Sequence, residues 1–343
     1  MSDGIDTQWA LGGAVTVAVA ALLSAIMIVA LYPWLKRYAL AKPNARSSHR
    51  TPTPQGGGIA VIAATLAAVA VALGLFSLGA SPGSPLPIIA VATVVMACLG
   101  AIDDIRPLPV GPRLLLQAIV VAAVIYALPD RLRVVPLLPW WIERGLLLIG
   151  GLWFVNLVNF MDGIDWMTVV EVIPLTVTLA VLGLAGALPP YGTILALALG
   201  GAMIGFAYFN RPIARVFLGD VGSLPIGLIL GVLLLLVAGA NHLVAALVMP
   251  LYYLADATIT LIRRMLRREP ILQAHRSHFY QRATDNGFTT MSVVTRVFVV
   301  NVGLGALALI TVVAPSGQSD IAALSGGAIL VAWLLVAFQR SRT

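Results

Sequence analysis

Long apolar stretches, separated by short polar ones, occupy almost all of this chain of 343 residues. About 20 consecutive apolar residues form a helix that crosses the hydrocarbon core of a bilayer. The pattern therefore predicts an all-α, polytopic membrane helical bundle with about eleven transmembrane helices. Three of the spans contain only 14 or 15 residues, so we expect their ends to extend into the polar flanks. The expected spans are Leu11–Leu31, Gly58–Leu78, Ile88–Ile102, Leu114–Leu128, Gly145–Val158, Met167–Leu188, Tyr191–Phe209, Leu224–Ala240, Leu243–Ile262, Val293–Val313 and Ile321–Phe338.

The composition supports a membrane protein. Hydrophobic residues make up 60% of the chain and charged residues only 10%, whereas soluble domains contain about 25% charged residues. A chain this apolar cannot cover a water-facing surface, so a basic nucleic-acid-binding domain is excluded despite the net charge of +7. The single cysteine, Cys98, excludes a disulfide framework and a cysteine-based zinc site. Because the sequence shows no linker-like segment, residues 1–343 are interpreted as one integral-membrane domain.

The distribution of basic residues predicts the orientation. Eighteen of the 21 lysines and arginines lie on one side of the eleven-span arrangement, and only Arg131, Arg133 and Arg144 lie on the other. Basic loops stay in the cytoplasm, so the N-terminus is expected outside and the C-terminus inside. The first span is followed, not preceded, by its basic cluster, which argues against a cleavable signal peptide. The basic loops therefore mark the predicted cytoplasmic face of the membrane.

The polar residues are concentrated in loops on the predicted cytoplasmic side. Adjacent Asp103 and Asp104 repel each other unless a cation or a base holds them. Asp162 and Asp165 would share one face if their segment is helical. Asp220 follows a glycine, where the backbone can approach a ligand closely. Five such residues are poorly explained as ordinary solvated acids in loops, because the whole chain contains only 14 acidic residues. Ligands that offer only oxygen atoms favour Mg²⁺, with Mn²⁺ as the other candidate.

Basic and amide groups accompany these acids. Three consecutive glycines, Gly56 to Gly58, precede the second span, and their amides could form an anion-binding nest. His275 and His278 lie three residues apart among arginines, which suggests contact with a diphosphate or a leaving group. The cluster Arg263–Arg268 is interpreted instead as a topology anchor. Carboxylates that hold a metal, surrounded by cationic groups, are what phosphoryl transfer requires, and the membrane setting suggests a lipid substrate.

Five segments together resemble the polyprenyl-phosphate N-acetylhexosamine-1-phosphate transferase family. They occur in the family's order, span nearly the whole chain, and are Asn44–Gly58, Asp103–Gln117, Asn156–Asp165, Phe217–Ser223 and His275–Arg282. The last segment is similar to the bacterial branch that initiates O-antigen and related surface glycans. The resemblance implies transfer of N-acetylhexosamine 1-phosphate from a UDP-sugar to undecaprenyl phosphate, with Mg²⁺ and release of UMP.

The resemblance also implies roles for individual residues. Asp220 matches the family's metal aspartate, assisted by Asp104, and Phe217 matches an aromatic residue that stacks on uracil. The implied catalytic residues are Asp103, Asp104, Asp162 and His278, and the implied substrate-binding residues are Arg50, Gly57, Asn159, Asp165, Phe217, His275, Arg276 and Arg282. One departure is Trp166, which stands where the family commonly has glycine and could narrow the pocket. Glu171 matches no family role.

Other functions remain to be weighed. A secondary transporter with intramembrane carboxylates is the alternative, although transporters place their polar groups near the bilayer midplane and these lie at the inner ends of spans. A CDP-alcohol phosphatidyltransferase lacks support, because its motif is absent. The expected partners are undecaprenyl phosphate, a UDP-N-acetylhexosamine and the bilayer, without nucleic acid, and a homodimer is allowed. The sequence leaves open which hexosamine is transferred and which glycan follows.

Overall fold

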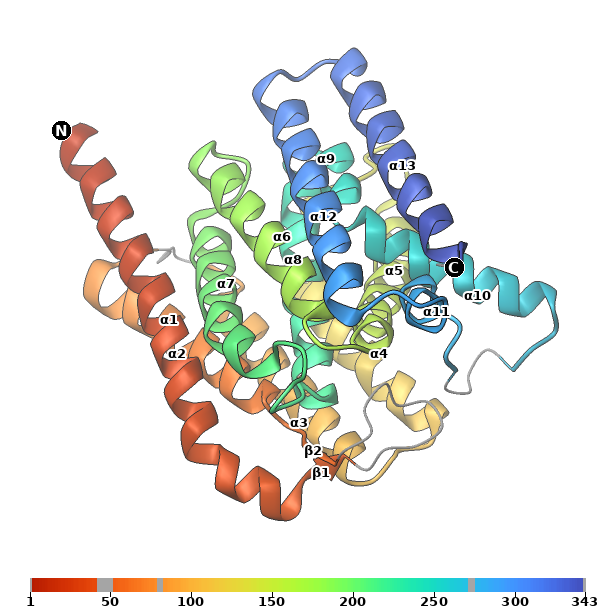
Figure 1. Ribbon diagram of the computed structural model, residues 1–343. Coiled ribbons are helices and arrows are strands. Elements are labelled where there is room, and N and C mark those ends of the chain that lie inside the picture. The colour runs from red at the N-terminus through yellow and green to blue at the C-terminus, as the bar shows by residue number, and fades with distance from the viewer. Residues whose placement is uncertain (1, 42–51, 79–82, 271–274, 342–343) are drawn as a thin grey trace.

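A computed structural model describes residues 2–41, 52–78, 83–270 and 275–341 (Figure 1). The described chain is an all-α membrane bundle with one small two-stranded sheet, as the apolar pattern predicts. The helices are α1 (Ser2–Tyr38), α2 (Gly58–Phe76), α3 (Leu86–Ile105), α4 (Val110–Ala127), α5 (Trp140–Met161), α6 (Met167–Leu184), α7 (Pro190–Asn210), α8 (Asp220–Gly239), α9 (Leu243–Val248), α10 (Leu251–Leu266), α11 (Phe279–Asp285), α12 (Thr290–Val313) and α13 (Gly317–Gln339). The antiparallel strands are β1 (Leu40–Ala41) and β2 (Thr53–Pro54).

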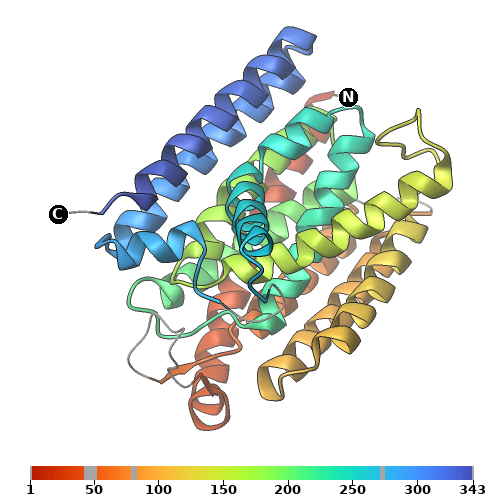
Figure 2. The same cartoon turned by 90° about the vertical axis from the view of Figure 1, so that its right-hand side faces the viewer.

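The helix α8 forms the centre of the bundle. Nearly all of its side chains are buried, and α2, α3, α5 and α9 pack around it. The helices α12 and α13 run side by side along one edge (Figure 2). Their outward faces expose large apolar side chains, which hydrocarbon can solvate, and this accounts for the unusually apolar surface.

Two glycines allow neighbouring helices to approach the start of α8 closely. A Cβ atom added to Gly100 of α3 would lie 2.2 Å from the carbonyl oxygen of Asp220. One added to Gly58 of α2 would lie 2.3 Å from the Cα atom of Gly222. Small residues at helix contacts permit this approach in membrane proteins. The backbone around Asp220 is therefore fixed between α2 and α3.

The prediction of eleven unbroken spans is wrong at one place. Ten helices in the described part of the chain are long and apolar enough to cross a membrane, and the expected span Leu243–Ile262 is not one of them. It is divided at Met249 and Pro250 into the short α9 and the polar-faced α10. Proline cannot donate a backbone hydrogen bond, so it favours an interruption. The three short predicted spans extend into their polar flanks, as expected, and form α3, α4 and α5.

The two termini lie at opposite ends of the bundle. The end of α1 connects to β1, which pairs with β2, and Gln55 then bridges to Phe217 just before α8. The end of α13 lies beside α11, where Asn286 donates a hydrogen bond to the carbonyl oxygen of Phe338. The start of α1 is therefore at the other end. We call the end at which α3, α5 and α7 finish and α8 begins the polar end.

Candidate active site

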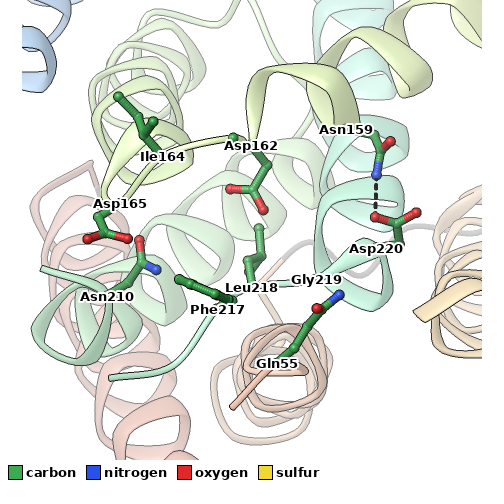
Figure 3. Close-up of a pocket in the computed structure, with 11 residues that line it drawn as sticks. Gln55, Asn159, Asp162, Ile164, Asp165, Asn210, Phe217, Leu218, Gly219 and Asp220 are labelled. Atoms are coloured by element: carbon green, nitrogen blue, oxygen red, sulfur yellow. Dashed lines mark hydrogen bonds between the residues drawn. The ribbon is translucent and has the colours of Figure 1, made fainter. Parts of the chain in front are cut away.

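Two neighbouring cavities open at the polar end. The first has a volume of about 170 Å³ and mostly polar walls (Figure 3). The second has a volume of about 610 Å³ and mostly apolar walls. Both are lined by Asn159, Asp162 and Gly163, so they meet at the loop between α5 and α6. The polar cavity is lined by Gln55, Asn159, Asp162, Gly163, Ile164, Asp165, Asn210, Phe217, Leu218, Gly219 and Asp220.

Asp104 caps the first turn of α8. Its two carboxylate oxygens accept hydrogen bonds from the backbone amides of Asp220 and Val221, each at 3.0 Å. The side-chain amide of Gln55 donates a third, at 2.5 Å. The first amides of a helix have no partner within the helix, and a carboxylate also suits the positive end of its dipole. Gly219, with φ of +77°, gives the chain the left-handed turn that leads into this cap.

Asp220 stands beside this cap and faces the polar cavity. Its Oδ1 atom accepts a hydrogen bond from the side-chain amide of Asn159 at 2.8 Å, and the same amide donates to the hydroxyl of Ser223 at 2.9 Å. The side chain of Asp103 lies within hydrogen-bonding distance of Asp220. Asp103 is also held by Arg113, at 2.7 Å. Acids from α3 and α8 thus meet at one place.

Asp162 occupies the junction of the two cavities. Its carboxylate points between Asp165 and Asp220 in Figure 3, and it accepts a hydrogen bond from the hydroxyl of Thr168. Burial raises the pKa of Asp162 to about 7, the carboxylates of Asp104 and Asp165 add to the rise, and the Thr168 hydroxyl opposes it. A carboxyl group with this pKa can exchange a proton near neutral pH.

The segment that carries Asp162 and Asp165 is not helical. The helix α5 ends at Met161, so the condition for a shared helical face is not met. Both acids nevertheless line the polar cavity. Asp165 accepts a hydrogen bond from the backbone amide of Ala214 at 3.0 Å, which ties this loop to the segment that follows α7.

Trp166 adopts a left-handed backbone conformation, with φ of +64°. Glycine reaches this region without strain, which gives a physical reason for a glycine at this position. The backbone amide of Trp166 donates to Asn210, and its indole donates to the carbonyl oxygen of Ala207. Its side chain is thereby held against α7, and among the described residues it is not part of either cavity wall. The pocket is not narrowed by Trp166 as the sequence suggested.

The three glycines at the start of α2, Gly56 to Gly58, do not form an open anion nest. The amides of Gly56 and Gly57 donate to the carbonyl oxygen of Phe217, at 3.1 and 2.9 Å, and that of Gly58 donates to Leu218 at 2.9 Å. These amides position Phe217 in the wall of the polar cavity. Gly57 therefore acts on the site through Phe217, while Arg50 lies outside the described residues.

His275 and His278 line the apolar cavity, as two of its few polar groups. Their rings stack with centroids 5.0 Å apart. The predicted arginines lie elsewhere: Arg276 pairs with Asp285 at 3.0 Å, and Arg282 lines a separate basic pocket. Among the described residues, neither arginine is part of the two cavity walls.

Asp256, on α10, is a residue of this site that the sequence interpretation missed. It is fully buried, and its Oδ1 atom lies 3.1 Å from Nδ1 of His278. It also accepts hydrogen bonds from the backbone amides of Phe279 and Tyr280, at 3.0 and 3.2 Å. A carboxylate on Nδ1 leaves Nε2 as the free imidazole nitrogen, and it fixes the ring. An acid inside a predicted span was the signal that could have identified it.

A metal site can be assessed from the donor groups. Within the described ranges, no three histidine, cysteine or acidic side chains form a ready-made metal cluster. Magnesium, however, is usually held by one or two carboxylates together with substrate phosphates and water. The oxygen atoms of Asp220 in the polar cavity fit that requirement.

Comparison with known proteins shows which family the chain resembles. Residues 86–238, from α3 to α8, match the model described as glycosyl transferase family 4. Over this region the chain is similar to this family. The similarity supports a membrane-embedded polyprenyl-phosphate sugar-1-phosphate transferase, as the five motifs suggested. The matched family region contains the acids Asp103, Asp104, Asp162 and Asp220, and it ends before the histidine loop.

Bacterial relatives support the resemblance to this family. A Bacillus subtilis (strain 168) protein named "Probable undecaprenyl-phosphate N-acetylglucosaminyl 1-phosphate transferase" is 28% identical over 78% of this chain and 77% of its own length. Two proteins named phospho-N-acetylmuramoyl-pentapeptide-transferase are similar over a shorter region. That of Gluconacetobacter diazotrophicus is 32% identical and that of Bartonella quintana (strain Toulouse) 30%, each over 46% of this chain and 47% of its own length. These similarities favour group transfer over the transporter alternative.

Proposed function

We propose that this protein transfers N-acetylhexosamine 1-phosphate from a UDP-sugar to undecaprenyl phosphate and releases UMP. The observation that supports this most strongly is the meeting of a polar and an apolar cavity at Asn159, Asp162 and Gly163. A nucleotide sugar is polar and an undecaprenyl chain is not, so one reaction between them needs two chemically different compartments. The name of the B. subtilis relative contains undecaprenyl phosphate and an N-acetylglucosaminyl 1-phosphate group.

The polar cavity suits the nucleotide sugar. Phe217 offers an aromatic face in its wall, and Asn210 and Gln55 offer amides. A bound Mg²⁺ would neutralise diphosphate charge, with Asp220 as its carboxylate ligand.

The apolar cavity suits the lipid. Leu114, Leu152 and Trp153 contribute apolar walls, and Arg113 and His278 contribute donors near Asp162. An isoprenoid chain would lie along the apolar walls. Its phosphate would then reach the donors where the two cavities meet.

The reaction joins an oxygen atom of the lipid phosphate to the β-phosphorus of the UDP-sugar. The bond between this phosphorus and the bridging oxygen breaks, and UMP leaves with the electron pair. Asp162 is the acid best placed to take a remaining proton from the lipid phosphate, because it lines both cavities and burial raises its pKa to about 7. Asp103 and Asp104 are committed to Arg113 and to the α8 amides, respectively. They are therefore better suited to positioning Asp220 than to taking this proton.

In its imidazolium form, in which Nε2 carries a proton, His278 would stabilise the charge that develops as the diphosphate breaks. Its ring lines the cavity while Asp256 holds Nδ1. A positioned donor directed at developing charge lowers the barrier because no reorganisation is needed during the reaction.

The setting follows from the charge distribution. We place the polar end at the cytoplasmic face of a bacterial inner membrane, where the positive-inside rule puts basic loops. The product would begin a surface glycan such as O-antigen.

The deciding experiment uses purified protein with undecaprenyl phosphate, Mg²⁺ and a panel of UDP-N-acetylhexosamines. The expected result is UMP release that requires both substrates, together with a lipid-linked diphosphate sugar detected by mass spectrometry. Absence of UMP with every donor sugar would contradict the proposal. UMP release without the lipid would instead indicate hydrolysis of the nucleotide sugar.

A further inference from the structure

The helix α10 changes character along its length. In its first half Tyr252 and Asp256 are buried. In its second half the apolar side chains of Ile262, Met265 and Leu266 are 45%, 57% and 77% exposed. This half projects from the body of the bundle beside α11 (Figure 1). A helix with exposed apolar residues and several arginines is typical of one that lies in a membrane interface.

A basic pocket lies beside this part of α10. It brings together four guanidinium groups and one carboxylate. Arg264 is already paired with Glu269, at 2.8 Å, and donates to the carbonyl oxygen of Pro270. Within the described ranges, no carboxylate lies within ion-pairing distance of Arg263, Arg267 or Arg282. The pocket is lined by Thr260, Arg263, Arg264, Arg267, Glu269, Ser277 and Arg282.

This pocket is lined by a different face of α10 and of the histidine loop than the apolar cavity. Leu261, His275 and His278 line the apolar cavity, whereas Thr260 and Ser277, their neighbours in sequence, line the basic pocket. A ligand in the pocket would contact the back of the loop that carries His278. It would not enter the cavities in which transfer takes place.

We propose that this pocket binds the phosphate group of an anionic membrane phospholipid. Guanidinium groups bind phosphate oxygens through charge-assisted hydrogen bonds, often in pairs. The exposed apolar residues on the same helix favour a phosphate that carries acyl chains over a free one. A phospholipid held here would anchor α10 in the interface and brace the loop behind His278. This inference concerns binding and does not depend on the proposed transfer reaction.

The test compares three forms of the purified full-length protein in nanodiscs that contain phosphatidylcholine with a minor share of phosphatidylglycerol. The test variant is Arg263→Gln with Arg267→Gln. The control variant, Arg37→Gln with Arg340→Gln, loses the same charge from exposed positions on α1 and at the end of α13. Native mass spectrometry counts the phosphatidylglycerol molecules retained after release from the nanodisc. A second arm adds inorganic phosphate or glycerol phosphate as competitor.

The wild type and the control should retain one more phosphatidylglycerol than the test variant. Loss of two charge-assisted contacts should reduce retention at least about tenfold. Arg263→Lys with Arg267→Lys keeps the charge and should retain more lipid than the glutamine variant, which guards against a loss caused by misfolding. Equal retention by all forms would overturn the proposal. Displacement of the lipid by inorganic phosphate at a similar concentration would show a free-phosphate site and overturn it as well.

Discussion

The clearest quantitative prediction concerns the pH dependence set by Asp162. Burial raises the pKa of this carboxyl group from 3.8 to about 7, so it holds its proton up to neutral pH. If the carboxylate form accepts a proton from the lipid phosphate, activity rises as the pH rises through 7. A group with this pKa is about one-tenth ionised at pH 6 and about nine-tenths ionised at pH 8, so kcat/KM should rise about tenfold across this range. A carboxyl group with an ordinary pKa would give a flat profile there.

The matched variants make this prediction specific. Thr168→Val removes the hydroxyl that donates to Asp162, and this loss should move the midpoint to higher pH. Asp162→Asn should remove the dependence together with most of the activity. The assay is initial UMP release over a pH series with saturating Mg²⁺, with enzyme integrity checked at each pH. A wild-type profile that is flat from pH 6 to 8, or an unchanged midpoint in Thr168→Val, would refute the assignment of the proton to Asp162.

The same raised pKa of Asp162 should make the folded protein less stable as the pH rises, although activity increases. The folded state binds this proton more tightly than the unfolded state does. Its contribution to stability is therefore present at low pH and is lost as the pH rises towards 7. Asp162→Asn should abolish this contribution, so the thermal midpoint of the variant should fall less than that of the wild type between pH 5 and pH 8. The comparison requires the same detergent and no substrate.

Three further predictions test other parts of the site and the threading. Asp220→Asn should lower kcat at least about a thousandfold, because a metal supplies several kcal/mol of charge stabilisation. Chelation should abolish turnover by the wild type, and added Mg²⁺ should restore it. Near-normal activity of the folded variant would contradict the metal assignment. His278→Ala should lower kcat about a hundredfold. Asp256→Asn should shift the pH profile of kcat and should change KM less. Small effects in both variants would show that the pair is only structural. Single cysteines at positions 276 and 317 in a Cys98→Ser background should react with an impermeant reagent from opposite sides of the membrane, and labelling from one side would exclude the predicted orientation.

The fold was largely predictable because a bilayer imposes simple requirements. A spanning helix must be long and apolar, and ten such helices lie where the sequence predicts them. The ninth predicted span failed because hydrophobicity alone does not register an interruption. Pro250 and the polar face that follows it divide this segment into α9 and α10. Most of the deeply buried residues of α10 lie in its first half.

Parts of the site were predictable for a related reason. Acids are rare in a chain with 10% charged residues, so their gathering at span ends pointed to Asp162 and Asp220. The structure places both in one cavity wall. The sequence could not show how each acid is engaged. That Asp104 would cap α8 depends on a contact between residues more than 100 positions apart.

By itself, the sequence determined the membrane class, the approximate spans and the set of residues available for chemistry, because these follow from composition and local order. The tertiary structure decided which groups meet. It directed the glycine amides to Phe217, placed Trp166 outside the cavity walls and brought Asp256 to the imidazole of His278. The physical reason is that hydrogen bonds and burial depend on positions in space. Helices packed side by side bring together residues that are far apart along the chain.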